Sequence, residues 1–251
     1  MDLTAYRNKE IEKARTDDLM ALLPDNCRGT ALDIGARDGW FSSLLAEKFD
    51  KVTALDLEKP SIIHTRIHCV KGDATDLNFD SGEFDLVFCA EVLEHITSKH
   101  LQKACTEIKR VANRYILIGG PFKQDIRIGR TKCYTCGKRN PPWGHVNSFD
   151  ELKLKNLFSL CDVKKISFVG ENNECTNSFS VLLMDFAGNP YGTYHQEEPC
   201  VHCGGKLRKL PQRNILQKVA TRAAFYSKNI QQRFRSPHPN WIHILFEKQR
   251  T

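Results

Sequence analysis

The first half of the chain alternates between short apolar runs and stretches with the spacing of an amphipathic helix. The apolar runs lie at residues 30–35, 51–57, roughly 66–71, 84–92 and 114–120. The run FDLVFCAEV (84–92) is apolar almost throughout, as expected of a parallel strand buried on both faces. Between the runs, WFSSLLAEKF and residues 98–112 show helical periodicity. Strands that alternate with helices predict an α/β fold with a doubly wound, mostly parallel sheet.

The alternation stops after the fifth strand. Residues 121–147 are polar and rich in proline. The segment SFDELKLKNLFSL then predicts a helix capped by Ser148, with Glu151 completing a capping box. Residues 163–170 predict a sixth strand and 239–248 a last strand. The predicted sheet therefore has seven strands.

Two further helices are expected before the last strand. The segment TNSFSVLLMDFAG favours a helix that Gly188 ends, and a long helix is expected at roughly 212–234. Apolar residues recur along the long helix at spacings of three and four, at Ile215, Val219, Ala223, Tyr226, Ile230 and Phe234. We interpret residues 1–251 as a single domain in which 121–147 and 188–238 form an insert and a basic helical region.

Charge is unevenly distributed along the chain. Residues 201–251 contain 11 Lys or Arg and a single acid, Glu247, whereas the whole chain has a net charge of +7. This asymmetry favours an anionic partner for residues 206–235, either nucleic acid or a membrane surface, although a solvated helix face would show the same pattern. No apolar run reaches the length of a membrane-spanning helix, and the charged N-terminus does not resemble a secretory signal. We therefore expect a cytoplasmic protein.

A glycine turn follows the first strand and predicts a site for a nucleotide-like cofactor. Asp33, Gly35 and Gly39 lie at or just beyond the strand's carboxyl end, where open parallel sheets bind ligands. Asp56 ends the second strand, 21 residues after Gly35, and a carboxylate there can accept both hydroxyls of a ribose. Arg37 takes the place of the usual middle glycine, which argues against a standard dinucleotide loop.

Four segments in order resemble one family. LDIGARDGWFS, ALDL, GDATDLNFDSGEFDLVFCAEVLEHI and RYILIGGPF together resemble a class I S-adenosylmethionine-dependent methyltransferase, with its Rossmann-like sheet. The nearest branch is the small-molecule group typified by ubiquinone-biosynthesis methyltransferases. The resemblance covers roughly residues 25–125 and the segment GHVNSFD. It implies S-adenosylmethionine as cofactor and methyl transfer as activity.

The resemblance also implies roles for particular residues. Asp33 would order the loop at the methionine part of the cofactor, Asp56 would bind the ribose hydroxyls, and Asp73 would bind the adenine amine. The complete set of expected cofactor-binding residues is Asp33, Gly35, Gly39, Asp56, Leu57, Asp73, Ala74 and Glu91.

Four of the ten cysteines form two CxxC pairs. The pairs are Cys133 with Cys136 and Cys200 with Cys203, and a glycine follows each pair. Four thiolates suit tetrahedral zinc, and structural zinc sites are commonly closed sets of four cysteines. We expect a structural zinc ion that pins the insert after the fifth strand to the C-terminal region. A redox role for either pair is the alternative.

Methyl transfer from a sulfonium is an in-line displacement, for which the protein supplies orientation and, for a hydroxyl acceptor, a base. His145, in PPWGHVNSFD, is the candidate base, because similar methyltransferases often carry a histidine there. Packing or helix capping by His145 is the alternative. Glu94 and His95 follow the fourth strand and are further candidates to face the site.

The sequence does not identify the acceptor of the methyl group, and three hypotheses fit it. One hypothesis is O-methylation of a small molecule or a sugar, including a lipid-linked sugar, with the basic helix resting on anionic lipid. The second is methylation of RNA, with the basic tail gripping phosphates. The third is a zinc-bridged binding module without catalysis, against which the presence of Asp33, Asp56 and Asp73 weighs.

Overall fold

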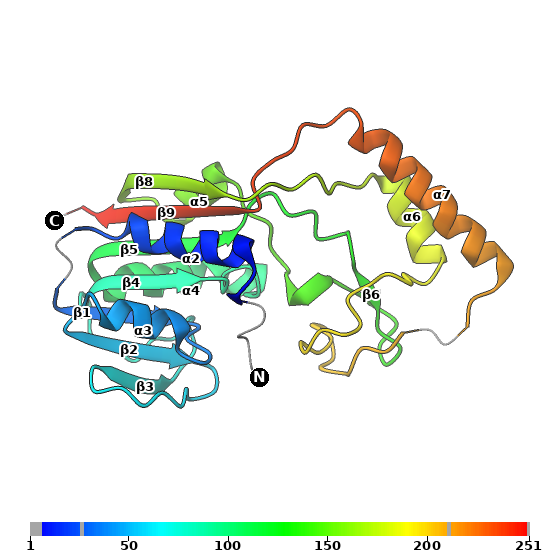
Figure 1. Cartoon of the computed structure of the whole chain (residues 1–251). Helices are drawn as coiled ribbons and strands as arrows, with labels where there is room; N and C mark the ends of the chain where they lie inside the picture. The colour runs from blue at the N-terminus through cyan, green and yellow to red at the C-terminus, as the bar shows by residue number, and fades with distance from the viewer. Residues whose placement is uncertain (1–6, 26–27, 210–211, 250–251) are drawn as a thin grey trace. The chain divides into compact units, whose positions relative to one another are not determined.

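The computed structural model describes residues 7–25, 28–209 and 212–249, and its chain divides into two compact units (Figure 1). The sheet unit comprises residues 1–122, 149–170 and 239–251. The cysteine unit comprises residues 123–148 and 171–238. Both segments of the cysteine unit lie, in sequence, between strands or helices of the sheet unit.

A seven-stranded sheet forms the centre of the sheet unit. In sequence order its strands are β1 (Thr30–Ile34), β2 (Lys51–Asp56), β3 (Ile67–Lys71), β4 (Phe84–Ala90), β5 (Ala112–Pro121), β8 (Cys161–Val169) and β9 (Trp241–Lys248). The spatial order is β3-β2-β1-β4-β5-β9-β8. The first five strands are parallel, and β9 runs antiparallel to both β5 and β8. The predicted mostly parallel seven-stranded sheet is confirmed.

Helices cover both faces of this sheet. The cluster on one face contains side chains of α4 (Ser98–Val111) and α5 (Glu151–Leu157), and the cluster on the other contains side chains of α2 (Glu10–Leu22) and α3 (Trp40–Ala46). Figure 1 shows α2 and α3 in front of the sheet and α4 behind it. The central strands alternate their side chains between the two clusters, so that Leu32 packs on the α4 face and Ala31 on the α2 face. Both faces are therefore buried, as a parallel sheet requires.

Two local expectations differ from the structure. Helix α5 is capped by Asp150, whose carboxylate accepts the Lys153 amide at 2.8 Å, so the predicted Ser148 cap is wrong. Aspartate is as good an N-cap as serine, and the helix begins two residues later than the serine would allow. Helix α2 was not predicted, because Glu12 and Arg15 belong to its buried face and interrupt the apolar periodicity.

The cysteine unit contains little regular structure. It holds the short strands β6 (Thr131–Lys132) and β7 (Arg139–Asn140), a 3-10 turn η1 (Pro142–Gly144), and the helices α6 (Ser178–Phe186) and α7 (Ile215–Gln232). Asn177 caps α6, and Asn214 begins α7 with a full capping box to Gln217. Both helices expected from the sequence in this region are confirmed.

Candidate functional site

The turn after β1 has a backbone path that depends on glycine. Gly35 and Gly39 both have φ of +82°, in the left-handed region. A Cβ on Gly35 would lie 2.3 Å from Val92 Cγ2, and one on Gly39 would lie 2.3 Å from Ile62 Cδ1. Arg37, at the position that weakened the dinucleotide reading, is itself left-handed with φ of 47°. The turn therefore passes close to neighbouring side chains at two points where only glycine fits.

Asp33 lies at the base of this turn and is buried, with 2% of its surface exposed. The Ser42 hydroxyl, from the first turn of α3, donates to Asp33 Oδ2 at 2.5 Å. Burial raises the pKa of the Asp33 carboxyl to about 7, against the lowering effect of the Ser42 hydrogen bond. The carboxyl thus ties the end of β1 to the start of α3 and fixes the turn between them. Sequence reasoning missed Ser42.

Asp56, at the end of β2, holds the same turn from the other side. Its Oδ2 accepts the Arg37 amide at 2.8 Å, and its Oδ1 accepts the Leu57 amide at 2.7 Å. The Leu57 side chain is 64% exposed. The two backbone bonds fix the orientation of the carboxylate at the end of the strand, which preorganises it as a hydrogen-bond acceptor.

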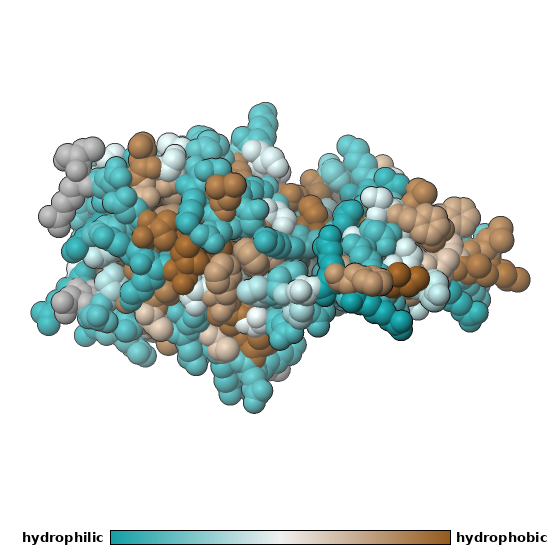
Figure 2. Space-filling view, turned by 90° about the horizontal axis from the view of Figure 1, so that it is seen from above, coloured by the Kyte–Doolittle hydropathy of each residue, from teal (hydrophilic) through white to brown (hydrophobic). Residues whose placement is uncertain are grey.

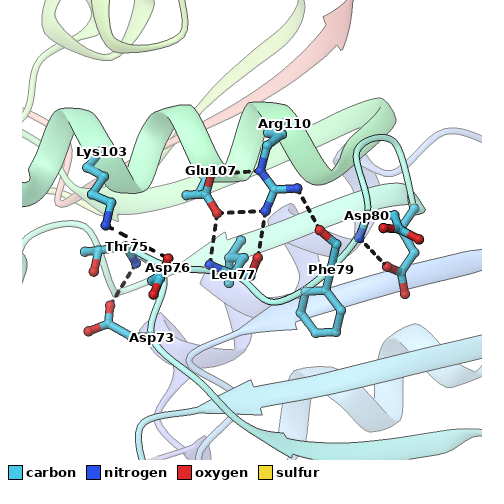
Figure 3. Close-up of polar contacts among 10 residues, drawn as sticks. Asp73, Thr75, Asp76, Leu77, Phe79, Asp80, Lys103, Glu107 and Arg110 are labelled. Atoms are coloured by element: carbon cyan, nitrogen blue, oxygen red, sulfur yellow. Dashed lines mark hydrogen bonds and ion pairs between the residues drawn. The ribbon is translucent and has the colours of Figure 1, made fainter.

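Asp73 and Ala74 begin the loop that follows β3. The Asp73 carboxylate accepts the Thr75 amide at 2.8 Å, which forms a local turn (Figure 3). Ala74 is buried against the core on the α4 face. The loop therefore leaves the sheet in a fixed conformation.

Two side chains of α4 hold the rest of this loop (Figure 3). Arg110 donates to the carbonyl oxygens of Leu77 and Phe79 at 2.6 and 2.7 Å. Glu107 accepts the Leu77 amide at 3.0 Å and two hydrogen bonds from the Arg110 guanidinium. The Arg110 bond lowers the pKa of Glu107, so this carboxylate stays ionised. Sequence reasoning did not find this clamp.

Two carboxyl side chains follow β4: that of Glu94 is buried, whereas that of Glu91 is partly exposed. Glu91 has a left-handed backbone, with φ of 58°, and its Oε1 lies 3.4 Å from Arg15 Nη1 of α2. Glu94 is fully buried, and within the described residues neither of its carboxylate oxygens has a hydrogen-bond partner. Burial raises the pKa of both carboxyls, and for Glu94 the neighbouring Glu91 raises it further. Such paired carboxyls with raised pKa values are typical of functional sites.

The predicted cofactor residues are brought to one edge of the sheet. Asp33, Asp56, Asp73 and Glu91 end or follow β1, β2, β3 and β4, four neighbouring parallel strands whose carboxyl ends share that edge. The amide of Gly35 donates to the Leu55 carbonyl at 2.8 Å, which joins the glycine turn to the end of β2. This is the edge at which open α/β sheets bind ligands.

His145, the candidate base, belongs to the cysteine unit and follows η1. Its Nδ1 lies 2.7 Å from Oε1 of Gln124. An amide oxygen can only accept, so Nδ1 carries the proton in the neutral ring and Nε2 is the basic nitrogen. Gln124 thus selects the tautomer that a general base at Nε2 requires. The ring of Trp143, two residues earlier, packs edge-to-face with the His195 ring, with the ring centroids 5.3 Å apart.

The two CxxC pairs meet within the cysteine unit. The four Sγ atoms of Cys133, Cys136, Cys200 and Cys203 all lie within 4.8 Å of one another. The Sγ atoms of Cys133 and Cys203 are 3.7 Å apart, and those of Cys136 and Cys200 are 3.8 Å apart. Four sulfurs at about 2.3 Å from a tetrahedral zinc lie about 3.8 Å from each other. The four thiols therefore fit a zinc ion in both number and spacing.

The backbone around each pair has the same hydrogen-bond pattern. The glycine after each pair, Gly137 or Gly204, has a positive φ and donates its amide to the first cysteine's carbonyl at 2.8 Å. The amide of Cys133 donates to the Lys138 carbonyl, and that of Cys200 donates to the Gly205 carbonyl, both at 2.9 Å. Two equivalent loops that face each other across four thiols are the arrangement of a closed structural metal site.

A cavity of about 350 Å³ lies within the cysteine unit. Its charged lining residues are paired: Arg127 with Asp125 at 2.7 Å, Lys228 with Glu174 at 3.4 Å, and Arg130 with Asp185. The aromatic side chains of Trp143, Tyr191 and Phe225 also line it. Its volume falls in the range of small-molecule sites, and its walls combine aromatic surface with neutralised polar groups.

Known proteins similar to this chain include methyltransferases. Residues 32–115 match the family model described as "Methyltransferase domain". A curated relative, "Ubiquinone biosynthesis O-methyltransferase" of Idiomarina loihiensis, is 31% identical over 87 residues. The match covers 30% of this chain and 36% of the relative, so the chain spans about a third of that protein's length.

Solved structures extend the likeness to the fold of the whole chain. An S-adenosylmethionine-dependent methyltransferase from Archaeoglobus fulgidus is 18% identical, with a TM-score of 0.55 over 98% of this chain and 97% of its own. The N-methyltransferase NodS of Bradyrhizobium japonicum, in complex with S-adenosyl-L-homocysteine, is 15% identical, with a TM-score of 0.54 over 98% of this chain and 92% of its own. These likenesses show the fold. Together with the family match, they show that residues 32–115 resemble a methyltransferase domain and that the sheet unit has the fold of S-adenosylmethionine-dependent methyltransferases.

Proposed function

We propose that this protein transfers a methyl group from S-adenosylmethionine, bound at the edge formed by β1 to β4, to a small molecule or a sugar. The observation that supports it most is the arrangement of Asp33, Asp56 and Asp73 at the ends of adjacent strands around a glycine turn. In this proposal Asp56 accepts hydrogen bonds from the ribose hydroxyls, and Asp73 accepts one from the adenine amine. Gly35 and Gly39 let the backbone pass close to the methionine part. Leu57, Ala74 and Glu91 line the same site.

The cofactor step can be tested by calorimetry of the full chain with S-adenosylmethionine. Asp56→Ala should weaken binding by about 1.5–3 kcal/mol, or roughly tenfold or more, because a hydrogen-bonded charged acceptor is lost. Glu58→Ala is the matched control, since Glu58 lies two residues further on, is exposed, and pairs with the exposed Lys71 at 3.6 Å. Absence of binding by the wild type, or equal losses in the two variants, would contradict the proposal.

We propose O-methylation, with His145 as the base that removes the acceptor's hydroxyl proton through Nε2. The reaction needs a base because a neutral hydroxyl is a poor nucleophile toward the sulfonium methyl group. Gln124 acts as a positioning residue, because it selects the tautomer through Nδ1. A lipid-linked sugar fits this proposal best, because its sugar carries hydroxyls to methylate and its lipid suits the exposed apolar side chains of α6 and α7.

The acceptor side can be tested by measuring release of S-adenosylhomocysteine with panels of hydroxylated compounds and lipid-linked sugars. His145→Ala should lower kcat about a hundredfold, and Gln124→Ala should lower it less while shifting its pH dependence. His195→Ala is the control, because it replaces another histidine of the same unit. Unchanged turnover in His145→Ala removes the catalytic role without touching the cofactor step.

The four cysteine thiolates would hold zinc as a structural ion. All four ligand positions are filled by protein sulfur, which leaves no open position for substrate or water. The ion would supply cohesion and no chemistry to the methyl transfer. The cavity of the cysteine unit, with its aromatic and charge-paired walls, supports a compact, neutral, polar acceptor such as a sugar.

A further inference from the structure

Large apolar side chains cover the outer surface of α6 and α7. We call this surface the apolar face; it consists of Phe179, Leu182 and Phe186 of α6, Ile215, Leu216, Val219, Tyr226 and Ile230 of α7, and Phe234 just beyond α7. These side chains are between 43% and 85% exposed. Figure 2 shows hydrophobic side chains gathered on the surface of this part of the molecule. A helix pair that leaves so many large apolar groups outside is unusual for a surface in contact with water alone.

The reason lies in how the two helices pack. The residues of α7 that are buried are small: Ala220, Thr221 and Ala224. The Ser180 hydroxyl of α6 donates to the Ala224 carbonyl at 2.9 Å, and the Asn177 amide donates to Ser227 Oγ at 3.1 Å. Small and polar residues thus form the contact between the helices, and the large apolar residues stay exposed.

An open groove runs between α6 and α7 on the apolar face. It is lined by Phe179 from α6 and by Ala223, Tyr226 and Ile230 from α7. The stripe of Ile215, Val219, Tyr226 and Ile230 follows the helical repeat, so these side chains form one continuous surface. The groove and the stripe therefore offer one apolar surface of two adjacent helices.

The charges around this face are positive. Helix α7 contains no Asp or Glu, and its exposed Lys218 and Arg222 lie one turn apart beside the apolar stripe. The one acid of α6, Asp185, is neutralised by ion pairs to Arg130 and Arg139. An apolar surface bordered by cations matches the boundary between acyl chains and anionic headgroups.

We infer that the apolar face of α6 and α7 docks this protein on an anionic lipid bilayer, with the helices lying in the plane of the interface. Within the described residues, no helix is long and apolar enough to cross a membrane. Aliphatic side chains make up about half of the face, and these favour acyl chains over nucleic-acid bases, which stack on aromatic rings. The inference does not depend on the proposed methyl transfer.

Vesicle flotation of the zinc-loaded full chain tests this inference. We expect binding to phosphatidylcholine vesicles that contain phosphatidylglycerol, and at least about tenfold weaker binding to phosphatidylcholine alone. Val219→Glu/Ile230→Glu should lower binding to the anionic vesicles at least about tenfold. Leu152→Glu/Leu160→Glu is the matched control, because it makes the same change at apolar residues of the sheet unit that are 67% and 80% exposed.

A second variant separates charge from apolar contact and does not alter any apolar side chain. Lys218→Gln/Arg222→Gln should weaken binding to anionic vesicles several-fold and leave the weak binding to neutral vesicles unchanged. Zinc content and the circular dichroism spectrum, measured on every variant, report whether the variants remain folded.

Four results would overturn the inference. The first is a wild-type chain that does not bind anionic vesicles. The second is binding by the Val219→Glu/Ile230→Glu variant that equals wild type or equals the control variant. The third is a wild-type dimer, seen by analytical ultracentrifugation, that this variant splits while vesicles are not bound, because the face is then an interface between copies. RNA binding that depends on the same residues, without vesicle binding, would equally overturn it.

Discussion

The two units of this protein bury apolar surface to very different extents. In the sheet unit, side chains of β1, β4 and β5 are packed on both faces, with Leu32, Val87 and Ile116 fully buried. In the described part of the cysteine unit, the buried members of the cluster around the CxxC pairs are Cys133, Cys200 and Leu207. The large apolar residues of α6 and α7 are exposed. A hydrophobic core stabilises the first unit, whereas the second depends on thiols, caps and ion pairs.

A segment with little hydrophobic core can still keep a defined structure. A small segment with little core needs a metal, a disulfide or a partner surface to offset the entropy of ordering it. The cysteine unit has four thiols at the spacing of a zinc site and a face suited to a lipid surface. Its apolar residues are then available for contacts outside the chain, because folding of the unit does not consume them.

The largest expected effect is that of metal removal, which acts on one unit alone. Cys133→Ser/Cys203→Ser, or a strong chelator, should unfold the loops around the CxxC pairs, because structural zinc contributes about 10–16 kcal/mol in small zinc domains. Hydrogen exchange should show lost protection over 131–140 and 200–205 and unchanged protection in β1, β4 and β5. Cys69→Ser, a thiol of β3 outside the cluster, is the control. Loss of protection in both units together would show that the sheet unit also depends on the metal, and would contradict the prediction.

The sequence predicted most of the sheet unit for a physical reason. Its central strands β1, β2, β4, β5 and β9 are buried on both faces, so each appears as an apolar run, and the acids that end β1 and β2 stand at fixed offsets from those runs. Helix α2 escaped prediction because its buried Glu12 and Arg15 remove the periodic signal. The Arg110 clamp escaped because it joins α4 to carbonyls more than 30 residues away, a tertiary contact without a local pattern.

The cysteine unit was predictable in a different way. The CxxC spacing was sufficient to indicate the four thiols, because the chemistry of the ligands constrains the sequence directly. The periodicity of α7 predicted the helix correctly but not which side of it is buried. In the structure the buried side is the one with Ala220 and Ala224, and the apolar stripe faces outward. Periodicity identifies a face, whereas burial depends on what the neighbouring helix presents.

The next effect concerns the cost of burying charge in the well-packed unit. Asp33 has a folded-state pKa of about 7, raised by burial from 3.8. Stability from the protonated carboxyl is therefore full below pH 4 and is lost as the pH rises to 7, by roughly 4 kcal/mol at most, because one proton per pH unit is worth about 1.4 kcal/mol. Asp33→Asn should remove this loss. Unfolding of β1 and β4, followed by hydrogen exchange from pH 4.5 to 7.5, measures it.

The test for Asp33 is the difference in unfolding free energy between the wild type and Asp33→Asn at each pH. Glu91 and Glu94 also have raised pKa values and leave a residual slope of the same sign in both proteins. The thiol cluster of the other unit does not change between the two proteins. A wild-type stability that rises with pH relative to Asp33→Asn would show that the carboxyl is stabilised when ionised and would refute the expected sign.

The smallest effect is expected at the clamp on the loop after β3. Arg110→Ala removes two hydrogen bonds to the carbonyls of Leu77 and Phe79, each worth about 1.5–3 kcal/mol from a charged donor. Most of that loss loosens the loop rather than unfolding the unit, because Ala74 and Leu77 remain packed in the core. S-adenosylmethionine should therefore bind about five- to tenfold more weakly by calorimetry, since the binding energy must now order the loop around Asp73.

Lys103→Ala provides the contrast within the same helix. Lys103 reaches Asp76 only at 4.0 Å, and both side chains are mostly exposed, so the pair contributes little. Its loss should leave cofactor affinity within about twofold of wild type. Equal weakening by the two variants would mean that α4 acts on the loop through its charge as a whole. If Arg110→Ala alone weakens cofactor binding, the loss of affinity comes from the two hydrogen bonds to the carbonyls of Leu77 and Phe79. The loop after β3 would then be a part of the sheet unit that, like the cysteine unit, is ordered by polar contacts.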